Sequence, residues 1–418
     1  MILKLIYFIQ LIKRNIFIQT MPFAILVVII YLIYLPLFNM EGMRKEVEEP
    51  AFRYLNAWLS DKNESFSEPN IFIFEINNQY LKARKLIDDS NSTNENYGYF
   101  FPRKYIIEFI ENIDKLVIKP KYLLIDYNLN YSSYSQTRLS KDDRRLIALL
   151  NDSNRSYTIF IPHDNKYNFL DSYITSKKVV FCSTNFPKNS DGITRRFESY
   201  DTINDRNFTN IALLLSDNNV SDYKKYHVIE NRILFKKRVN NSSYWNNITY
   251  YSNFLDMHRM IPTKYENSII LFGANYKDSN DIDKVQYTLW GEDNINGVEV
   301  IANSVMSLFY FDNKLSSLEP FKALLISFLY AFLAKMMTSL IIQQIIFLKK
   351  YETIMSIIIL LIMSTLFSYY IFIHYSLWFN YLVPSILWSI YNFTFWIKEK
   401  YYFIKNKRKN EYECAKQS

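Results

Sequence analysis

Residues 71–76 read IFIFEI, and two further runs of the same kind follow at residues 122–127 (YLLIDY) and 268–272 (SIILF). Each is a short apolar run of the length and composition typical of a buried β-strand. Residues 158–161 and 179–182 are shorter runs of the same type. These segments predict a sheet whose central strands are covered on both faces.

The segments between these strands carry helix signals. A helix is expected after Pro102, where isoleucines recur every three or four residues. Ser140 and Asp143 have the spacing of a capping box, which starts a second helix. Further helices are expected at residues 211–215 and 298–309. Strands that alternate with helices predict an α/β domain with a largely parallel or mixed sheet.

Four long apolar segments predict transmembrane helices. The first, residues 16–38, contains no charged residue and is long enough to cross a bilayer. A cleavable signal peptide is the alternative, but the run is longer than a signal core and no small-residue cleavage pattern follows it. The other three segments lie after the α/β region, at residues 323–347, 354–373 and 377–397.

Basic residues border these segments on alternate sides. They precede the first segment, separate the second from the third, and follow the fourth. The positive-inside rule then places residues 1–15 and 398–418 in the cytoplasm and residues 39–320 outside it. The lipid bilayer is therefore an expected partner. Because the net charge of +8 resides largely in these flanks, we expect no nucleic-acid partner.

Glycine is scarce, with six residues in the chain, and five of them lie at turn positions of the outer domain. A sequence of this kind is expected to keep glycine where the backbone needs a positive φ or a close approach. We therefore expect that valine in place of Gly192 or Gly273 destabilises the outer domain.

The order of these features resembles the type-two CHASE domain, a cyclase- and histidine-kinase-associated sensory extracellular domain of bacteria. The resemblance spans about residues 71–308 and is carried by Ile76-Asn77-Asn78, Gly98 with Phe101-Pro102-Arg103, Asp126, Asp191-Gly192 with Arg195-Arg196, Gly273, and Gly297-Val298-Glu299 with Ala302-Asn303. It implies a sensory domain in the bacterial cell membrane, facing the periplasm, with one helix before it and commonly three after it. Members usually carry acidic residues where this chain has Asn77 and Asn78.

The candidate ligand-binding residues are Asn77, Asn78, Arg103, Asp126, Asp191, Arg195 and Arg196. The arginines are suited to an anionic ligand. The alternative is that Arg103 forms a structural ion pair and that Arg195 and Arg196 lie on a solvated turn. Asp126 ends a buried strand, at the usual ligand edge of an α/β sheet, and its alternative role is to stabilise a turn.

Signatures of catalysis and metal binding are missing from the sequence. The four histidines are scattered without zinc spacing, and no Walker A, dinucleotide-binding or nucleophile-elbow motif occurs. Cys182 and Cys414 are expected in different compartments and cannot pair. We therefore expect no enzyme, no cofactor and no metal site.

The expected function is signal reception by the outer domain. About twenty residues follow the fourth apolar segment, too few to bury a catalytic core. We therefore expect the membrane helices to transmit an unknown signal to a separate histidine kinase, cyclase or other signalling protein. The resemblance also implies a homodimer. The alternative is a structural or assembly component of the cell envelope whose outer domain binds another protein.

Overall fold

A computed structural model gives the fold. It describes residues 56–67, 69–77, 81, 102–127, 129, 139–163, 169–188, 192–216, 231–251, 265–275, 282–285, 293–310, 316–317, 352–375 and 377–378, and single positions near residues 325–333 and 401–405. The chain divides into two compact units. The larger is Arg53–Leu315, and the other combines Met1–Phe52 with Ser316–Ser418.

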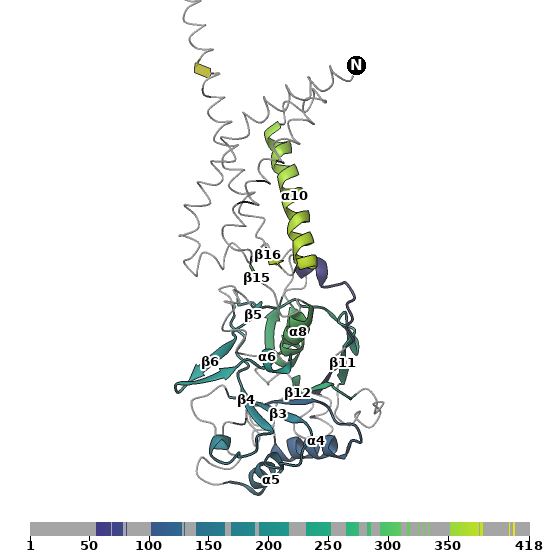
Figure 1. The fold of residues 1–418 in the computed structure, drawn as a ribbon, viewed down its shortest axis with the longest axis vertical. Coiled ribbons are helices and arrows are strands. Elements are labelled where there is room, and N and C mark those ends of the chain that lie inside the picture. The colour runs from purple at the N-terminus through teal and green to yellow at the C-terminus, as the bar shows by residue number, and fades with distance from the viewer. Residues whose placement is uncertain are drawn as a thin grey trace, which may run out of the picture. The chain divides into compact units, whose positions relative to one another are not determined.

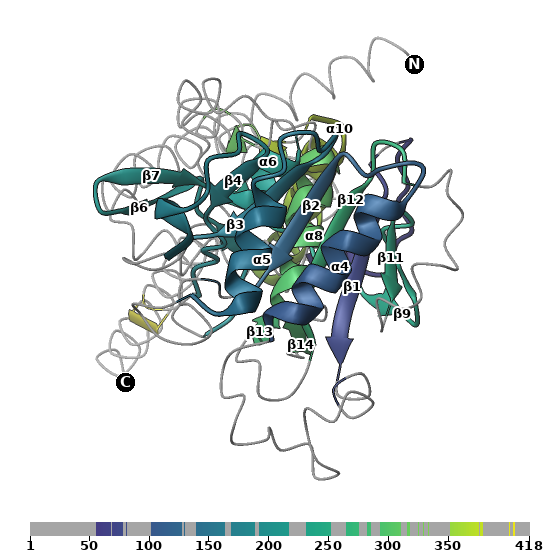
Figure 2. The ribbon, with the colours of Figure 1, turned by 90° about the horizontal axis from the view of Figure 1, so that it is seen from below.

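The larger unit is built on an eight-stranded sheet in the order β4-β3-β2-β12-β1-β11-β10-β9, most of whose strands are labelled in Figure 2. Strands β4 to β11 of this order pair in parallel, and β10 and β9 add an antiparallel edge. This confirms the predicted α/β class with a largely parallel, mixed sheet. The bounds are β1 Ile71–Asn77, β2 Tyr122–Asp126, β3 Thr158–Pro162, β4 Val179–Cys182, β9 Arg238–Val239, β10 Ser242–Ser243, β11 Ile248–Tyr251 and β12 Ile269–Asn275.

Helices cover both faces of this sheet (Figures 1 and 2). Helices α4 (Arg103–Lys115) and α5 (Lys141–Leu150) lie on one face, and α6 (Ile211–Leu215) and α8 (Gly297–Tyr310) lie on the other. Both helices begin where the sequence predicted. Pro102 occupies the N-cap position of α4 without a side-chain hydrogen bond, and the predicted capping box of α5 forms with both of its hydrogen bonds. Local sequence thus defines where these two helices begin.

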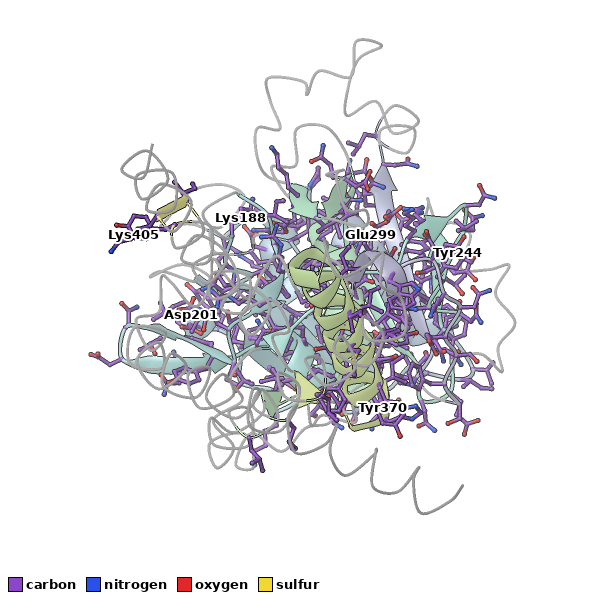
Figure 3. All side chains as sticks on the ribbon, turned by 90° about the horizontal axis from the view of Figure 1, so that it is seen from above. Lys188, Asp201, Tyr244, Glu299, Tyr370 and Lys405 are labelled. Carbon is purple, nitrogen blue, oxygen red and sulfur yellow. The ribbon has the colours of Figure 1, made fainter. Side chains whose placement is uncertain are left out.

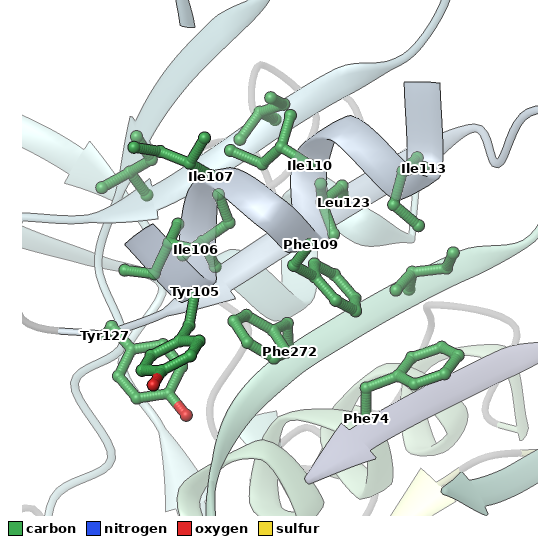
Figure 4. Close-up of a cluster of buried hydrophobic side chains, with 14 of the residues drawn as sticks. Phe74, Tyr105, Ile106, Ile107, Phe109, Ile110, Ile113, Leu123, Tyr127 and Phe272 are labelled. Atoms are coloured by element: carbon green, nitrogen blue, oxygen red, sulfur yellow. The ribbon is translucent and has the colours of Figure 1, made fainter. Parts of the chain in front are cut away.

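The main core lies between α4 and the sheet (Figure 4). Phe109 of α4 stacks on Phe272 of β12, with ring centroids 4.0 Å apart, and Phe74 of β1 meets the edge of Phe109. The isoleucines that predicted this helix are fully buried here. Each fully buried side chain of this size stabilises the fold by about 1.5–3 kcal/mol.

On the opposite face of the sheet, α8 packs closely against β12. A Cβ built on Gly273 of β12 would lie 2.3 Å from Cγ1 of Val298. Gly192 differs, because its φ is +77° and nothing lies within 4 Å of an added Cβ. The sequence predicted glycine at positions that need a close approach or a positive φ. Gly273 allows the close approach of α8, and Gly192 adopts the positive φ.

Several small elements have no counterpart among the sequence predictions. The hairpin of β13 (Ile282–Val285) and β14 (Asp293–Asn296) leads directly into α8. Two further antiparallel pairs join β5 (Arg196–Phe197) to β8 (Asn231–Arg232) and β6 (Tyr200–Ile203) to β7 (Arg206–Thr209). A 3-10 helix, η1, spans Phe169–Ser172.

The second unit contains α10 (Glu352–Tyr375), which includes the third predicted apolar segment, and a short parallel pair of β15 (Ser316–Ser317) with β16 (Leu377–Trp378). Within the part of the chain that the structure describes, no helix is both long and apolar enough to cross a membrane. The first predicted segment lies outside the described residues, as do the second and fourth apart from a few positions.

Candidate functional site

A buried carboxylate, Glu75, lies on the sheet face that α8 covers. Side chains of β1 alternate, so Phe72, Phe74 and Ile76 enter the core beneath α4 while Glu75 points the other way. Glu75 is only 1% exposed. In the strand register, Glu75, Gly273 and Asp126 form one row across three strands, near the carboxyl ends of those strands. A charge buried this deeply requires a partner.

Arg238 provides that partner and brings in a second carboxylate. Its Nη1 donates to both oxygens of Glu75 at 2.9 Å and to Oε1 of Glu299 at 2.9 Å. Arg238 belongs to the edge strand β9. Its side chain extends over Tyr250 of β11, with the guanidinium carbon 4.1 Å from the centroid of the tyrosine ring. Asn296 Nδ2 donates to Glu75 at 3.4 Å. We refer to Glu75, Arg238 and Glu299 as the charge cluster.

The charge cluster holds two carboxylates and one guanidinium, so its charges do not balance. Burial and the Glu75 carboxylate raise the pKa of Glu299 to about 7. Arg238 and the amino end of α8 favour the ionised carboxylate, but burial outweighs them. Burial also opposes the charge on Arg238, yet the two carboxylates prevail and raise its pKa. Glu299, labelled in Figure 3, is therefore the member that exchanges a proton near neutral pH.

A cavity of about 490 Å³ opens beside the charge cluster. It lies where β14 enters α8, next to the carboxyl end of β12. Its lining is polar apart from one isoleucine and comprises Lys237, Arg238, Asn275, Asp293, Asn294, Ile295, Asn296 and Glu299. Among the described residues, no group of three or more His, Cys, Asp or Glu side chains is placed to hold a metal ion. The arrangement is suited to binding a polar small molecule.

Buried hydrogen bonds fix the segment before Arg238 to α8. Asn303 Oδ1 accepts from the backbone amide of Lys236 and from Nε1 of Trp245, each at 3.0 Å. Its Nδ2 donates to the carbonyl of Glu299 at 2.8 Å. The same side chain therefore positions the backbone of Glu299 and the strand that carries Arg238.

The same segment is attached to a helix of the larger unit whose described residues are 56–59. Phe235 N donates to Oδ1 of Asn56 at 2.9 Å, and the buried Lys236 Nζ donates to the carbonyl of Leu59 at 2.8 Å. Burial lowers the pKa of Lys236 to about 8. Residues 234–238, which we call the bridging segment, thus connect this helix, α8 and the charge cluster.

Two of the residues predicted from sequence lie at this edge of the sheet. Asp126 is in the row of Glu75, and Asn77 pairs in register with Asn275, which lines the cavity. Asn78 and Asp191 fall outside the described residues. Asp126 and Asn77 therefore lie at the same edge of the sheet as the cavity, although neither is among its lining residues.

The predicted arginines lie elsewhere. Arg103 forms an ion pair with Asp143 at 3.6 Å between α4 and α5, on the opposite face of the sheet, and burial lowers its pKa to about 10. Arg195 is buried and Arg196 belongs to β5, and neither lines the cavity. The structure does not bring the three arginines together into one site.

The sequence reasoning did not select Glu75, Arg238 or Glu299 as site residues. A signal was present for two of them. Glu75 is the one charged residue in the apolar run IFIFEI, and Glu299 is the one charged residue of helix α8. Arg238 lies in a basic run, LFKKR, without any distinguishing pattern.

Replacement of Glu299 by glutamine is expected to change how stability depends on pH. The folded-state pKa of about 7 exceeds the ordinary value of 4.5, so between these values the folded state binds the proton more tightly. The wild-type free energy of unfolding therefore falls as pH rises through this window, by up to about 3 kcal/mol from this group. Glutamine does not ionise, so in Glu299→Gln this pH-dependent part of the free energy of unfolding is absent.

Unfolding measured across pH checks this expectation, with Glu198→Gln as the control because Glu198 is exposed. The control should keep the wild-type pH profile. An unchanged profile in Glu299→Gln would show that Glu299 does not take up a proton on folding.

Comparison with known proteins gives one match. A family model for the CHASE2 domain, an extracellular sensory domain, matches residues 24–339. The chain matched no curated protein and no solved structure. The match covers the whole larger unit, including the charge cluster, the cavity and the bridging segment. The chain belongs to the CHASE2 domain family.

Proposed function

We propose that this protein is a membrane-anchored receptor whose outer domain detects a signal in the cavity beside the charge cluster. Membrane helices transmit the change to a separate signalling protein, such as a histidine kinase or a cyclase. Membership of an extracellular sensory domain family supports the sensor role. The apolar segments at residues 16–38, 323–347, 354–373 and 377–397 support membrane anchoring.

The observation that carries this proposal is the bridging segment. Arg238, at its end, lines the cavity and binds both buried carboxylates, while Lys236 binds the carbonyl of Leu59 at the end of the helical residues 56–59. That helix follows the first predicted membrane segment. A ligand that moves Arg238 therefore acts on a segment in direct contact with the chain leading to the membrane.

Helix α8 provides a second connection. It contributes Glu299 to the cavity at its amino end, and its Ser307 accepts from the backbone amide of Leu234 at 2.8 Å. After α8 the chain continues toward the second predicted membrane segment. Both chain ends of the outer domain are thus linked to the cavity, as a receptor that signals through its membrane helices requires.

Photocrosslinking in native membranes tests the proposal. A photoreactive residue is placed at Tyr401, which is exposed and lies in the predicted cytoplasmic tail. We expect repeated capture of a kinase or cyclase. The yield should change several-fold in Glu299→Gln, because this substitution fixes the charge cluster in its protonated form. Capture in the control Glu198→Gln should equal that of the wild type.

A different capture result would contradict the receptor proposal. If only envelope-assembly proteins are captured, with the same yield in all variants, the protein is a structural component of the envelope and the receptor proposal is wrong.

The orientation assumed in the crosslinking experiment is checked by phosphatase fusions. A phosphatase fused after Tyr250 should be active outside the cell, and one fused after Ser418 should be inactive.

A further inference from the structure

Among the described residues that line the cavity or pair with its lining, carboxylates outnumber cations. Both cationic side chains in its lining are already paired: Lys237 with Asp61 at 3.1 Å, and Arg238 with Glu75 and Glu299. A further carboxylate, Asp293, lines the cavity and makes no ion pair with any described residue. Among the described residues, the charged lining side chains and their ion-pair partners comprise two cations and four carboxylates. An added positive charge would be stabilised here, and an added negative charge would be repelled.

Glu299 is the carboxylate placed to meet such a charge. Its side chain is 6% exposed and lines the cavity. Oε1 accepts from Arg238, whereas Oε2 accepts no hydrogen bond from the described residues. A carboxylate this deeply buried takes up either a proton or a cationic partner to offset its loss of hydration. Burial raises the pKa of Glu299 to about 7 even beside Arg238, so near neutral pH an entering cation competes with a proton for this carboxylate.

The size and remaining lining of the cavity indicate the kind of cation. About 490 Å³ is far more than a metal ion fills and lies within the range of small-molecule sites. Three amides, Asn275, Asn294 and Asn296, supply donors and acceptors for a polar organic molecule. A divalent metal would require several oxygen ligands around one point, and no such group of acids exists among the described residues.

We propose that the cavity binds a small organic cation whose primary ammonium group pairs with Glu299. This inference rests on the proposed receptor function and names the ligand class of the same cavity. The ammonium takes the place of the proton on Glu299, so binding releases that proton to solvent. The amides and Asp293 then bind the polar remainder of the ligand.

Calorimetry on the full chain in detergent tests the ligand class with three probes of matched length. These are 1,4-diaminobutane, the neutral 1,4-butanediol and the dianion succinate. We expect saturable binding of the diamine alone at millimolar concentration or below. Titrations in two buffers of different ionisation enthalpy should show proton release on binding near neutral pH.

The affinity for the diamine is expected to rise with pH through about 7 and then level off, as Glu299 loses its proton. The charged groups that face Glu299 come from each element around it: Glu75 on β1, Arg238 on β9, Asp293 on β14 and Lys237 of the bridging segment. The pKa of Glu299 lies in this range.

Glu299→Gln should weaken diamine binding at least tenfold and abolish proton release, whereas Glu198→Gln should change neither. Asp293→Asn, which leaves the charge cluster intact, should weaken binding several-fold and keep the proton release. Binding of succinate, or diamine binding unaffected by Glu299→Gln, would overturn the inference, and so would failure of the diamine to bind.

These outcomes are separable from those of the receptor proposal. Diamine binding with capture of envelope proteins alone would sustain the ligand class and refute the receptor. If a kinase or cyclase is captured with a yield that changes in Glu299→Gln, but no diamine binds, the receptor proposal is supported and the ligand class is refuted.

Discussion

Arg238→Met is expected to destabilise the larger unit by about 3–5 kcal/mol, because it leaves two buried carboxylates without their shared cation. Methionine keeps much of the length and apolar surface of arginine, so the loss comes mainly from the charge. Arg238 binds both oxygens of Glu75 and one of Glu299. Chemical denaturation of the full chain, followed by tryptophan fluorescence, measures the difference.

Lys237→Met is the matched control, one residue away. Lys237 pairs with Asp61, which is 57% exposed, and surface pairs of this kind contribute at most about 1 kcal/mol. The large loss in Arg238→Met should be partly restored when Glu75→Gln and Glu299→Gln are added, since no buried charge then remains unpaired. Equal effects of the two methionine variants would show that the charge cluster is hydrated and does not depend on Arg238.

Gly273→Ala is expected to cost about 2–3 kcal/mol, at the upper end of what one added methyl group causes in a closely packed interior. The new Cβ would lie 2.3 Å from Cγ1 of Val298, so β12 and α8 would have to move apart. Because Glu299 follows Val298 directly, this separation should also disturb the charge cluster. Thermal unfolding of the full chain measures the cost.

The reason for the cost can be isolated by a double-mutant cycle with Val298→Ala. Removal of Cγ1 leaves Cβ of residue 298 as the nearest atom, at 3.4 Å, so the alanines at 273 and 298 fit together. The double variant should therefore be more stable than the sum of the two single losses implies. Gly192→Ala is the control: its cost of about 1–2 kcal/mol arises from φ alone, and Val298→Ala should not reduce it. Additive losses in the first pair would exclude the packing explanation.

The ion-pair partner of Arg103 could not be predicted from the sequence. An arginine after a proline at a helix start is equally compatible with a ligand site and with a structural ion pair. The structure places Asp143 of α5 beside it, and both side chains are almost completely buried. The partner lies forty residues along the chain, and only helix packing brings the two together.

Local sequence by itself determined the central strands, the main helices and the class of the larger unit. Apolar runs predicted β1, β2 and β12, isoleucine spacing predicted α4, and the Ser140–Asp143 capping box predicted α5. These signals are readable because each depends on residues within one turn or one strand. The same local logic placed Asp126 at the carboxyl edge of the sheet, and the cavity lies near this edge.

Only the tertiary structure decided that β12 lies between β1 and β2, and that β9 returns along the far edge. This order brings Arg238 to Glu75, 163 residues earlier in the chain, and to Glu299, 61 residues later. The position of a charged residue in the sequence does not indicate its ion-pair partner. The partner is the opposite charge that tertiary packing brings close to it. The charge cluster and its cavity therefore follow from strand order, which is set by long-range burial of apolar surface.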